Sequence, residues 1–232
     1  MCTNYTPATP RQLIALGDWA AGVLPEGSWP EETYPGYLAP VVVQGTPGGP
    51  QSASACDIRL ARFGLIPRWC RDAAHAAMVG RGTYNARTET VTDKPSFRSP
   101  WLERRFALVP MQHYFEPCWE TGRSVRWRIA RADGEPFLVA ALHELWTDPL
   151  SQEHTHSFTL LTRNADTHPV LQRMHRPADE KRQVCIVSSQ DAHDWLDSPA
   201  DRALPWLMQR DGPELTGTPA PLREDPQAVL PF

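Results

Sequence analysis

The stretch RFALVPMQHYF at residues 105–115 predicts a β-strand, because apolar and aromatic residues dominate it. Two further apolar runs follow it, RWRIA at residues 126–130 and FLVAALHEL at residues 137–145. Asp133-Gly134 lies between these two runs, and Asp-Gly in such a position is a strong signal for a β-hairpin. We therefore expect consecutive strands in this region, the last two joined as a hairpin.

Strands are also expected on both sides of this region, at residues 41–43, 58–65, 158–162 and 184–187. Helices are fewer and are expected at residues 11–19, 96–104 and 189–196. The strands mostly follow one another rather than alternate with helices. This order predicts an α+β fold, a single domain with a curved, mainly antiparallel β-sheet or barrel core and a few peripheral helices.

The chain of 232 residues, 41% of them hydrophobic, is long enough for one large domain with a packed core. We expect this domain to span residues 1–198. Residues 199–232 are rich in Pro, Asp and Glu, which predicts an extended C-terminal tail, packed loosely on the body or partly disordered. The Gly-, Pro- and Ser-rich residues 45–54 are expected to form a surface loop.

The chain shows neither a bilayer-spanning apolar stretch nor the start of a secretory signal, so we expect a cytoplasmic protein that does not contact membranes. Its five cysteines include no CxxC pair, which argues against a disulfide framework and a structural zinc site. An alternative metal site would use His143, Glu144, His154 and His156, but an exposed hairpin end explains these residues better. We expect a monomer without cofactor or metal.

The basic residues are concentrated in the middle of the chain, although the formal net charge is −4. Residues 58–131 hold fourteen of the 23 Lys and Arg but only six of the 27 Asp and Glu. Nearly all of these cations are arginines, whose planar guanidinium suits phosphate better than a point charge does. The pattern indicates a phosphate-binding surface. The alternative is that these arginines pair with the acidic flanks across the fold.

Cys2 directly follows Met1, so removal of Met1 would place a thiol and a free α-amine on adjacent carbons. An α-amine has a pKa of about 8 and is partly neutral at physiological pH. It can condense with an aldehyde to a Schiff base, which the thiolate then attacks to close a thiazolidine ring. An internal cysteine lacks the free amine that this chemistry needs.

Five segments carry a family resemblance, and they occur in a defined order. They are Met1-Cys2, RFGLIPRW at residues 62–69, YNARTET at 84–90, LVP at 108–110 running to YFE at 114–116, and LT at 161–162 through NA at 164–165 to MHRP at 174–177. In this order they resemble the SRAP family, the SOS-response-associated-peptidase domain proteins that covalently shield abasic sites in single-stranded DNA. The resemblance spans roughly residues 1–195.

The resemblance implies a role for each matching residue. Cys2 would be the nucleophile that joins the ring-opened deoxyribose aldehyde, and Asn85 would hold the sugar and the Cys2 terminus. Arg87 would hold a flanking phosphate. Glu116 would be the acid/base that opens the closed sugar, and His175 would handle protons beside the aldehyde carbon.

Further DNA contacts are expected around this site. Trp69 and Phe63 would stack on bases beside the lesion, although core packing is the alternative for both and the favoured one for Phe63. Arg81, Arg98 and Arg104 are additional candidates for phosphate contacts. The chain also departs from the commonest family pattern, because Pro117 follows the glutamate where a tryptophan is often found, and Trp119 comes slightly later.

The resemblance implies a DNA-damage-response protein of the nucleoid. It would bind abasic sites in single-stranded DNA, crosslink itself to them, and lose Met1 autocatalytically or to an aminopeptidase. One alternative is an N-terminal-nucleophile thiol peptidase or amidohydrolase. Another is a non-covalent single-strand-binding module in which Cys2 has no role. The arginine-rich middle of the chain favours a phosphodiester substrate over a peptide.

Overall fold

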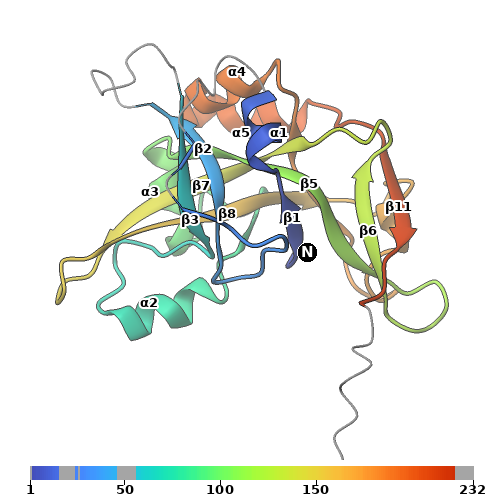
Figure 1. Cartoon of the computed structure of the whole chain (residues 1–232), viewed down its shortest axis with the longest axis horizontal. Helices are drawn as coiled ribbons and strands as arrows, with labels where there is room; N and C mark the ends of the chain where they lie inside the picture. The colour runs from blue at the N-terminus through green and yellow to red at the C-terminus, as the bar shows by residue number, and fades with distance from the viewer. Residues whose placement is uncertain (1, 16–23, 26, 46–55, 223–232) are drawn as a thin grey trace, which may run out of the picture.

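Strand β5 (Phe106–Cys118) is the centre of the computed structural model (Figure 1). Residues 2–15, 24–25, 27–45 and 56–222 are described by the structure. One edge of β5 pairs with β2 (Leu38–Gln44) and β1 (Tyr5–Pro7). The other edge pairs with β7 (Phe137–Thr147) and then with β6 (Val125–Arg131).

A barrel closes around β5. Strand β7 continues to β8 (His154–Asn164), and β8 lies parallel to β3 (Cys56–Phe63). Strand β3 pairs antiparallel with β2, which returns to β5. The ring β5–β7–β8–β3–β2 is antiparallel at every junction except β3–β8. The predicted α+β fold with a mainly antiparallel barrel core is thus confirmed.

The predicted hairpin at Asp133-Gly134 is wrong, although both of its strands exist. Ile129 of β6 lies opposite Tyr114, and Val139 of β7 lies opposite Val109. Strands β6 and β7 therefore run in the same direction along one edge of β5. Residues 132–136 form a local turn between them, in which Asp133 pairs with the Arg131 side chain. The Asp-Gly signal specified the turn correctly but not the reversal of the chain, which depends on which strand edge is available.

Helices and short strands surround the barrel (Figure 1). The helices are α1 (Pro10–Ala15), α2 (Ala73–Gly80), α3 (Pro95–Leu102), α4 (Ala192–Asp197) and α5 (Ala200–Met208), with a 3-10 turn at Leu171–Arg173. The short strands are β4 (Asn85–Arg87) and β9 (Arg182–Val184), which both pair with β8, β10 (Ile186–Val187) on β7, and β11 (Leu215–Pro219) on β6. Residues 16–19 of the first predicted helix and residues 46–54 of the predicted loop lie outside the described residues.

The segment after residue 198 is more ordered than its composition indicates. Helix α5 buries Ala203 and Leu207, and β11 adds a full antiparallel strand beside β6. The expectation of an extended, loosely packed tail is therefore wrong for α5 and β11. Sparse apolar residues at helical spacing still form a buried face despite the surrounding Pro, Asp and Glu. A domain boundary at residue 198 stays a prediction, and residues 223–232 lie outside the described part.

The barrel interior and the space under α3, α4 and α5 form separate apolar clusters. Trp195 packs on Phe106 in the helix-covered cluster, with ring centroids 4.6 Å apart. Phe63 stacks on Phe158 inside the barrel, at 5.1 Å. No helix among the described residues is long and apolar enough to cross a membrane.

Gly64 fixes how β3 leads toward α2. Its φ is +112°, and a Cβ at this position would lie 2.2 Å from the Gly80 carbonyl oxygen. A side chain is therefore excluded both by backbone conformation and by space. The close approach sets the path of the segment that carries Trp69.

Candidate active site

Cys2 lies in the barrel core beside the end of β5. Tyr5 of β1 is opposite Tyr114, and the backbone N–H of Phe115 donates to the Asn4 carbonyl at 2.9 Å. Extending this antiparallel register brings the residues ahead of β1 alongside Glu116. Cys2 is 1% exposed, and its Sγ donates weakly to the Asn4 carbonyl at 3.7 Å.

Asn85 holds the backbone of Cys2 in place. It is the first residue of β4, which β8 positions by parallel pairing of Asn85 with Leu160. Its Nδ2 donates to the Cys2 carbonyl at 2.9 Å. Its Oδ1 is buried and accepts no hydrogen bond from the described residues. One end of this amide thus orients the nucleophile, and the other can accept from a ligand.

Glu116 and His175 form a pair at the same end of β5. The Glu116 side chain is 2% exposed, and its Oε2 lies 3.0 Å from Nε2 of His175. His175 adopts a left-handed φ of 60°, and its backbone N–H donates to the Pro117 carbonyl at 2.6 Å. A bridge between Cys118 and Met174 holds the same segment against β5. These backbone contacts hold the His175 segment against the end of β5 that carries Glu116.

Electrostatics link this pair to Cys2. Burial raises the pKa of the Cys2 thiol strongly, and the negative charge of Glu116 raises it further. Burial also raises the pKa of Tyr114, and interactions with Glu116 and Cys2 raise it further. The Tyr114 hydroxyl has no hydrogen-bond partner among the described residues. The structure therefore brings Cys2, Asn85, Glu116 and His175 together, with a neutral thiol at physiological pH and a spare buried hydroxyl beside them.

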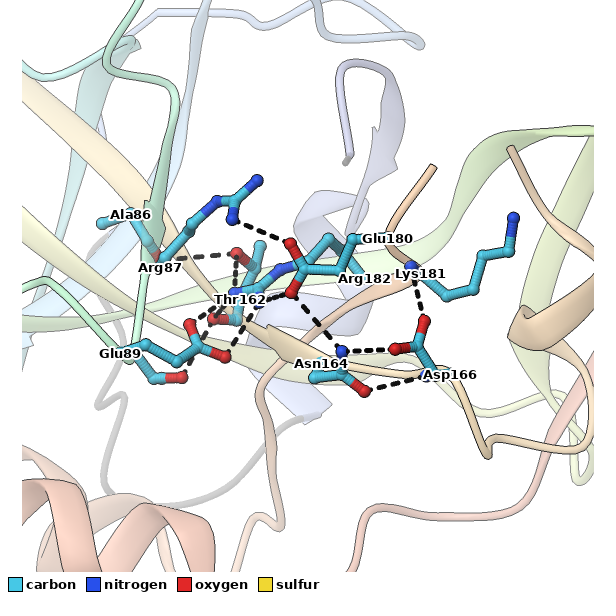
Figure 2. Close-up of polar contacts among 10 residues, drawn as sticks. Ala86, Arg87, Glu89, Thr162, Asn164, Asp166, Glu180, Lys181 and Arg182 are labelled. Atoms are coloured by element: carbon cyan, nitrogen blue, oxygen red, sulfur yellow. Dashed lines mark hydrogen bonds and ion pairs between the residues drawn. The ribbon is translucent and has the colours of Figure 1, made fainter. Parts of the chain in front are cut away.

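Arg87 is at the other end of β4 from Asn85 and belongs to a network of ion pairs and hydrogen bonds (Figure 2). Its side chain is 48% exposed, and its guanidinium contacts Glu180 at 2.8 Å. Glu180 in turn accepts from Arg182 at 2.7 Å, and Arg182 also forms a two-pronged pair with Glu89 at 2.8 and 2.9 Å. Sequence reasoning identified Arg87 but missed Glu180 as its partner, because the two residues are far apart in the chain.

The aromatic residues expected to stack on bases differ in exposure. Trp69 is 51% exposed and packs beside His75, with ring centroids 5.5 Å apart. Phe63 is 0% exposed inside the barrel, between Tyr5, Tyr84 and Phe158. The favoured interpretation of Phe63 as a core residue is therefore confirmed, and the base contact also considered for it is wrong. Trp69 stays a prediction.

The additional arginines also differ. Arg104 donates to the carbonyls of Ser198 and Asp197 at 3.0 and 2.6 Å, so its guanidinium ties the end of α4 to the body, and its expected phosphate contact stays a prediction. Arg81 and Arg98 are exposed and stay predictions. Several other arginines of the basic region pair with acidic residues, which agrees with the alternative that these arginines form ion pairs within the fold. Arg68 and Arg105, for example, share the buried Glu144.

Residues beside His175 were not assigned from the sequence. The Arg176 guanidinium lies over the Trp119 ring, 5.1 Å from its centroid. An arginine and an indole at this place offer a cation and a flat face to a nucleic acid. The only sequence signal was the displaced Trp119 after Pro117. Within the described residues, no group of three or more His, Cys, Asp or Glu is arranged to hold a metal ion.

Comparisons with known proteins agree with the geometry. The model of the SOS response associated peptidase (SRAP) family matches residues 1–219. The abasic site processing protein YoqW of Bacillus subtilis is 28% identical over 138 residues, which cover 58% of this chain and 55% of YoqW. The abasic site processing protein YoaM of the same organism is 34% identical over 89 residues, covering 37% of this chain and 36% of YoaM. The matches thus span about half or less of these relatives.

Solved structures show the same fold. A crystal structure of a protein from Bordetella bronchiseptica has a TM-score of 0.81 and 26% identity, covering 95% of this chain and all (100%) of that chain. A second, from Bacteroides thetaiotaomicron, has a TM-score of 0.74 and 19% identity, covering 93% of this chain and 90% of that chain. The second likeness concerns the fold alone.

Proposed function

The chain belongs to the SOS response associated peptidase (SRAP) family, and from this premise we propose that it processes abasic sites in DNA by becoming covalently attached to them. The lesion is bound in single-stranded DNA. Cys2, made N-terminal by removal of Met1, reacts with the aldehyde of the ring-opened deoxyribose. The product is a thiazolidine that shields the lesion as part of the DNA damage response.

The reaction balances with the loss of one water. The α-amine of Cys2 adds to the aldehyde carbon, and the resulting carbinolamine loses water to give a Schiff base. The thiol then adds across the C=N bond, so that a C–S bond forms and the thiol proton passes to nitrogen. Because Cys2 is a buried, protonated thiol, this last step needs a base close by.

The pair of Glu116 and His175 supplies the proton transfers. An abasic deoxyribose is mostly a closed furanose, and opening it requires a proton at the ring oxygen and removal of one from the hydroxyl. Glu116 is a buried carboxylate 3.0 Å from an imidazole nitrogen, so a proton can move between the two groups. We assign ring opening to Glu116 and the formation and collapse of the carbinolamine to His175.

One observation supports this function most directly. Asn85 donates to the Cys2 carbonyl at 2.9 Å, and this buried contact supports a role for the Cys2 backbone segment in the site. The unpartnered Oδ1 of Asn85 is left for a sugar hydroxyl.

Single strands are favoured over duplexes by the surroundings of the site. The exposed indole of Trp69 can stack only on an unpaired base. Arg87 offers a partly exposed guanidinium for a flanking phosphate.

The test is the intact mass of purified protein after incubation with a single-stranded oligonucleotide that carries one abasic site. We expect a protein lacking Met1 and a denaturant-resistant adduct equal to the sum of both masses minus one water. Cys2→Ala should give no stable adduct, whereas Cys70→Ala, which removes a buried cysteine elsewhere, should react normally. Stable adduct from Cys2→Ala at the wild-type yield would refute the mechanism. Binding without any adduct would support the non-covalent alternative.

A further inference from the structure

Arg87 forms an ion pair with an internal carboxylate. Oε2 of Glu180 lies 2.8 Å from a terminal nitrogen of Arg87. The side chains are 48% and 37% exposed, so the pair is accessible from solvent. A carboxylate and a phosphate make the same kind of charge-assisted contact with a guanidinium.

Glu180 is held independently of Arg87 (Figure 2). Its other oxygen, Oε1, accepts from Arg182 at 2.7 Å and from Asn164 Nδ2 at 3.4 Å. The Arg182 side chain is 2% exposed and is fixed by Glu89 and by the Thr162 carbonyl. Hydrogen bonding from Arg182 is also the first cause of the lowered pKa of Glu180, which keeps the carboxylate ionised.

Glu180 is therefore held by more contacts than Arg87 is. Glu180 keeps a charge partner when Arg87 leaves, because Arg182 stays behind it. Arg87 is at the end of the short strand β4, and its guanidinium donates to Glu180. Opening the pair moves the arginine side chain and leaves the rest of the network in place.

We propose that Glu180 is an internal competitor for DNA phosphate at Arg87, so that a strand binds only by exchanging its phosphate for this carboxylate. This inference rests on the proposed single-strand binding and names a residue that tunes it. The competitor lowers the affinity for intact strands. An abasic strand, once bound covalently, is no longer limited by this exchange.

The test is the affinity of the full chain for a fluorescently labelled, intact single-stranded oligonucleotide at fixed salt, measured by anisotropy. In Glu180→Gln, the amide oxygen can still accept from Arg182, while the amide nitrogen replaces the oxygen that Arg87 contacts. Because partly exposed ion pairs are weak, we expect binding to tighten by about 2- to 5-fold. Arg87→Ala should weaken binding, and Glu180→Gln should have no effect in the Arg87→Ala background.

The control is Glu153→Gln, which changes net charge equally. Glu153 is exposed and precedes β8, whereas Arg87 pairs with Thr162 near the other end of that strand. Glu153→Gln should leave the affinity unchanged. Unfolding midpoints monitor the fold, and Glu180→Asp, which keeps the charge but retracts it by one methylene, should also tighten binding if Glu180→Gln is unstable.

The outcomes separate this inference from the function. If Glu180→Gln and Glu180→Asp leave the affinity unchanged while Arg87→Ala weakens binding, Glu180 does not compete with phosphate, and the proposed function is not affected. Equal tightening by Glu153→Gln, or tightening that persists without Arg87, would be a general charge effect and also overturns it. A wild-type protein that neither binds nor crosslinks single strands overturns both.

Discussion

Replacing Glu116 by Gln should slow crosslinking to a natural abasic site by about 10²- to 10⁴-fold, the usual contribution of a positioned acid/base. Glutamine keeps the shape of the side chain and a hydrogen bond to His175 but cannot exchange a proton. The fold should change little. A charge-assisted hydrogen bond contributes about 1 kcal/mol more than a neutral one, which corresponds to a midpoint shift of about 2–4 °C for a chain of this size.

Two substrates distinguish ring opening from the later steps of crosslinking. Ring opening is needed for a closed abasic site but not for an oligonucleotide that already presents an open-chain aldehyde. Removing the Glu116 charge also removes one cause of the raised pKa of Cys2, so thiol addition should not be hindered. Single-turnover rates of adduct formation with both substrates should therefore show a large loss for the closed site and a much smaller one for the free aldehyde.

A matched control is Glu120→Gln. Glu120 follows four residues later, is 46% exposed in its side chain, and pairs with Arg173 at 3.6 Å rather than with His175. Its replacement should leave both rates near wild type. Equal slowing of both substrates by Glu116→Gln would place Glu116 in positioning Cys2, and no slowing would remove it from the mechanism.

Three further outcomes are expected. Asn85→Asp, which cannot donate to the Cys2 carbonyl, should slow adduct formation by about 2- to 10-fold or more in the same rate assay, and an unchanged rate would remove that contact from the mechanism. Gly64→Ala should destabilise the fold by at least about 3 kcal/mol in urea unfolding, whereas Gly134→Ala, also at positive φ but with open space around it, should lose about 1 kcal/mol. Burial lowers the pKa of His143 from 6.5 to about 4. Since only the unfolded chain takes up this proton between those values, stability should fall as pH drops from about 6.5 to about 4, and less steeply in His143→Gln.

The strands of this fold were predictable, and their partners were only partly so. Apolar runs at residues 105–115 and 137–145 correspond to β5 and β7, because alternating and continuous apolar patterns report local burial. The Asp133-Gly134 signal predicted a hairpin, in which the chain reverses direction. The actual geometry of this turn depends on β5 being long enough to pair with β7 and β6 in succession, which is a property of a distant strand.

The candidate site was predictable only through family resemblance. Nothing local to Asn85 indicates a contact with Cys2, and nothing near Glu116 indicates His175. Residue type alone does not decide such roles, since an aromatic ring such as Phe63 serves the core as well as a base, and a guanidinium such as that of Arg104 can bind a helix end as well as a phosphate. Contacts such as Arg87 with Glu180 depend on strand pairing that the sequence does not display.

Strand β5 pairs first with β7 and then with β6, and this change determines where Glu116 lies. Residues 106–111 pair with β7 and belong to the closed barrel, whereas residues 113–118 pair with β6. Glu116 lies on this second part, beyond the ring of strands and on the edge that β1 approaches. The barrel thus provides a rigid, apolar base that buries Cys2, while the extension of β5 carries the carboxylate beside the N-terminal segment and the loop of His175.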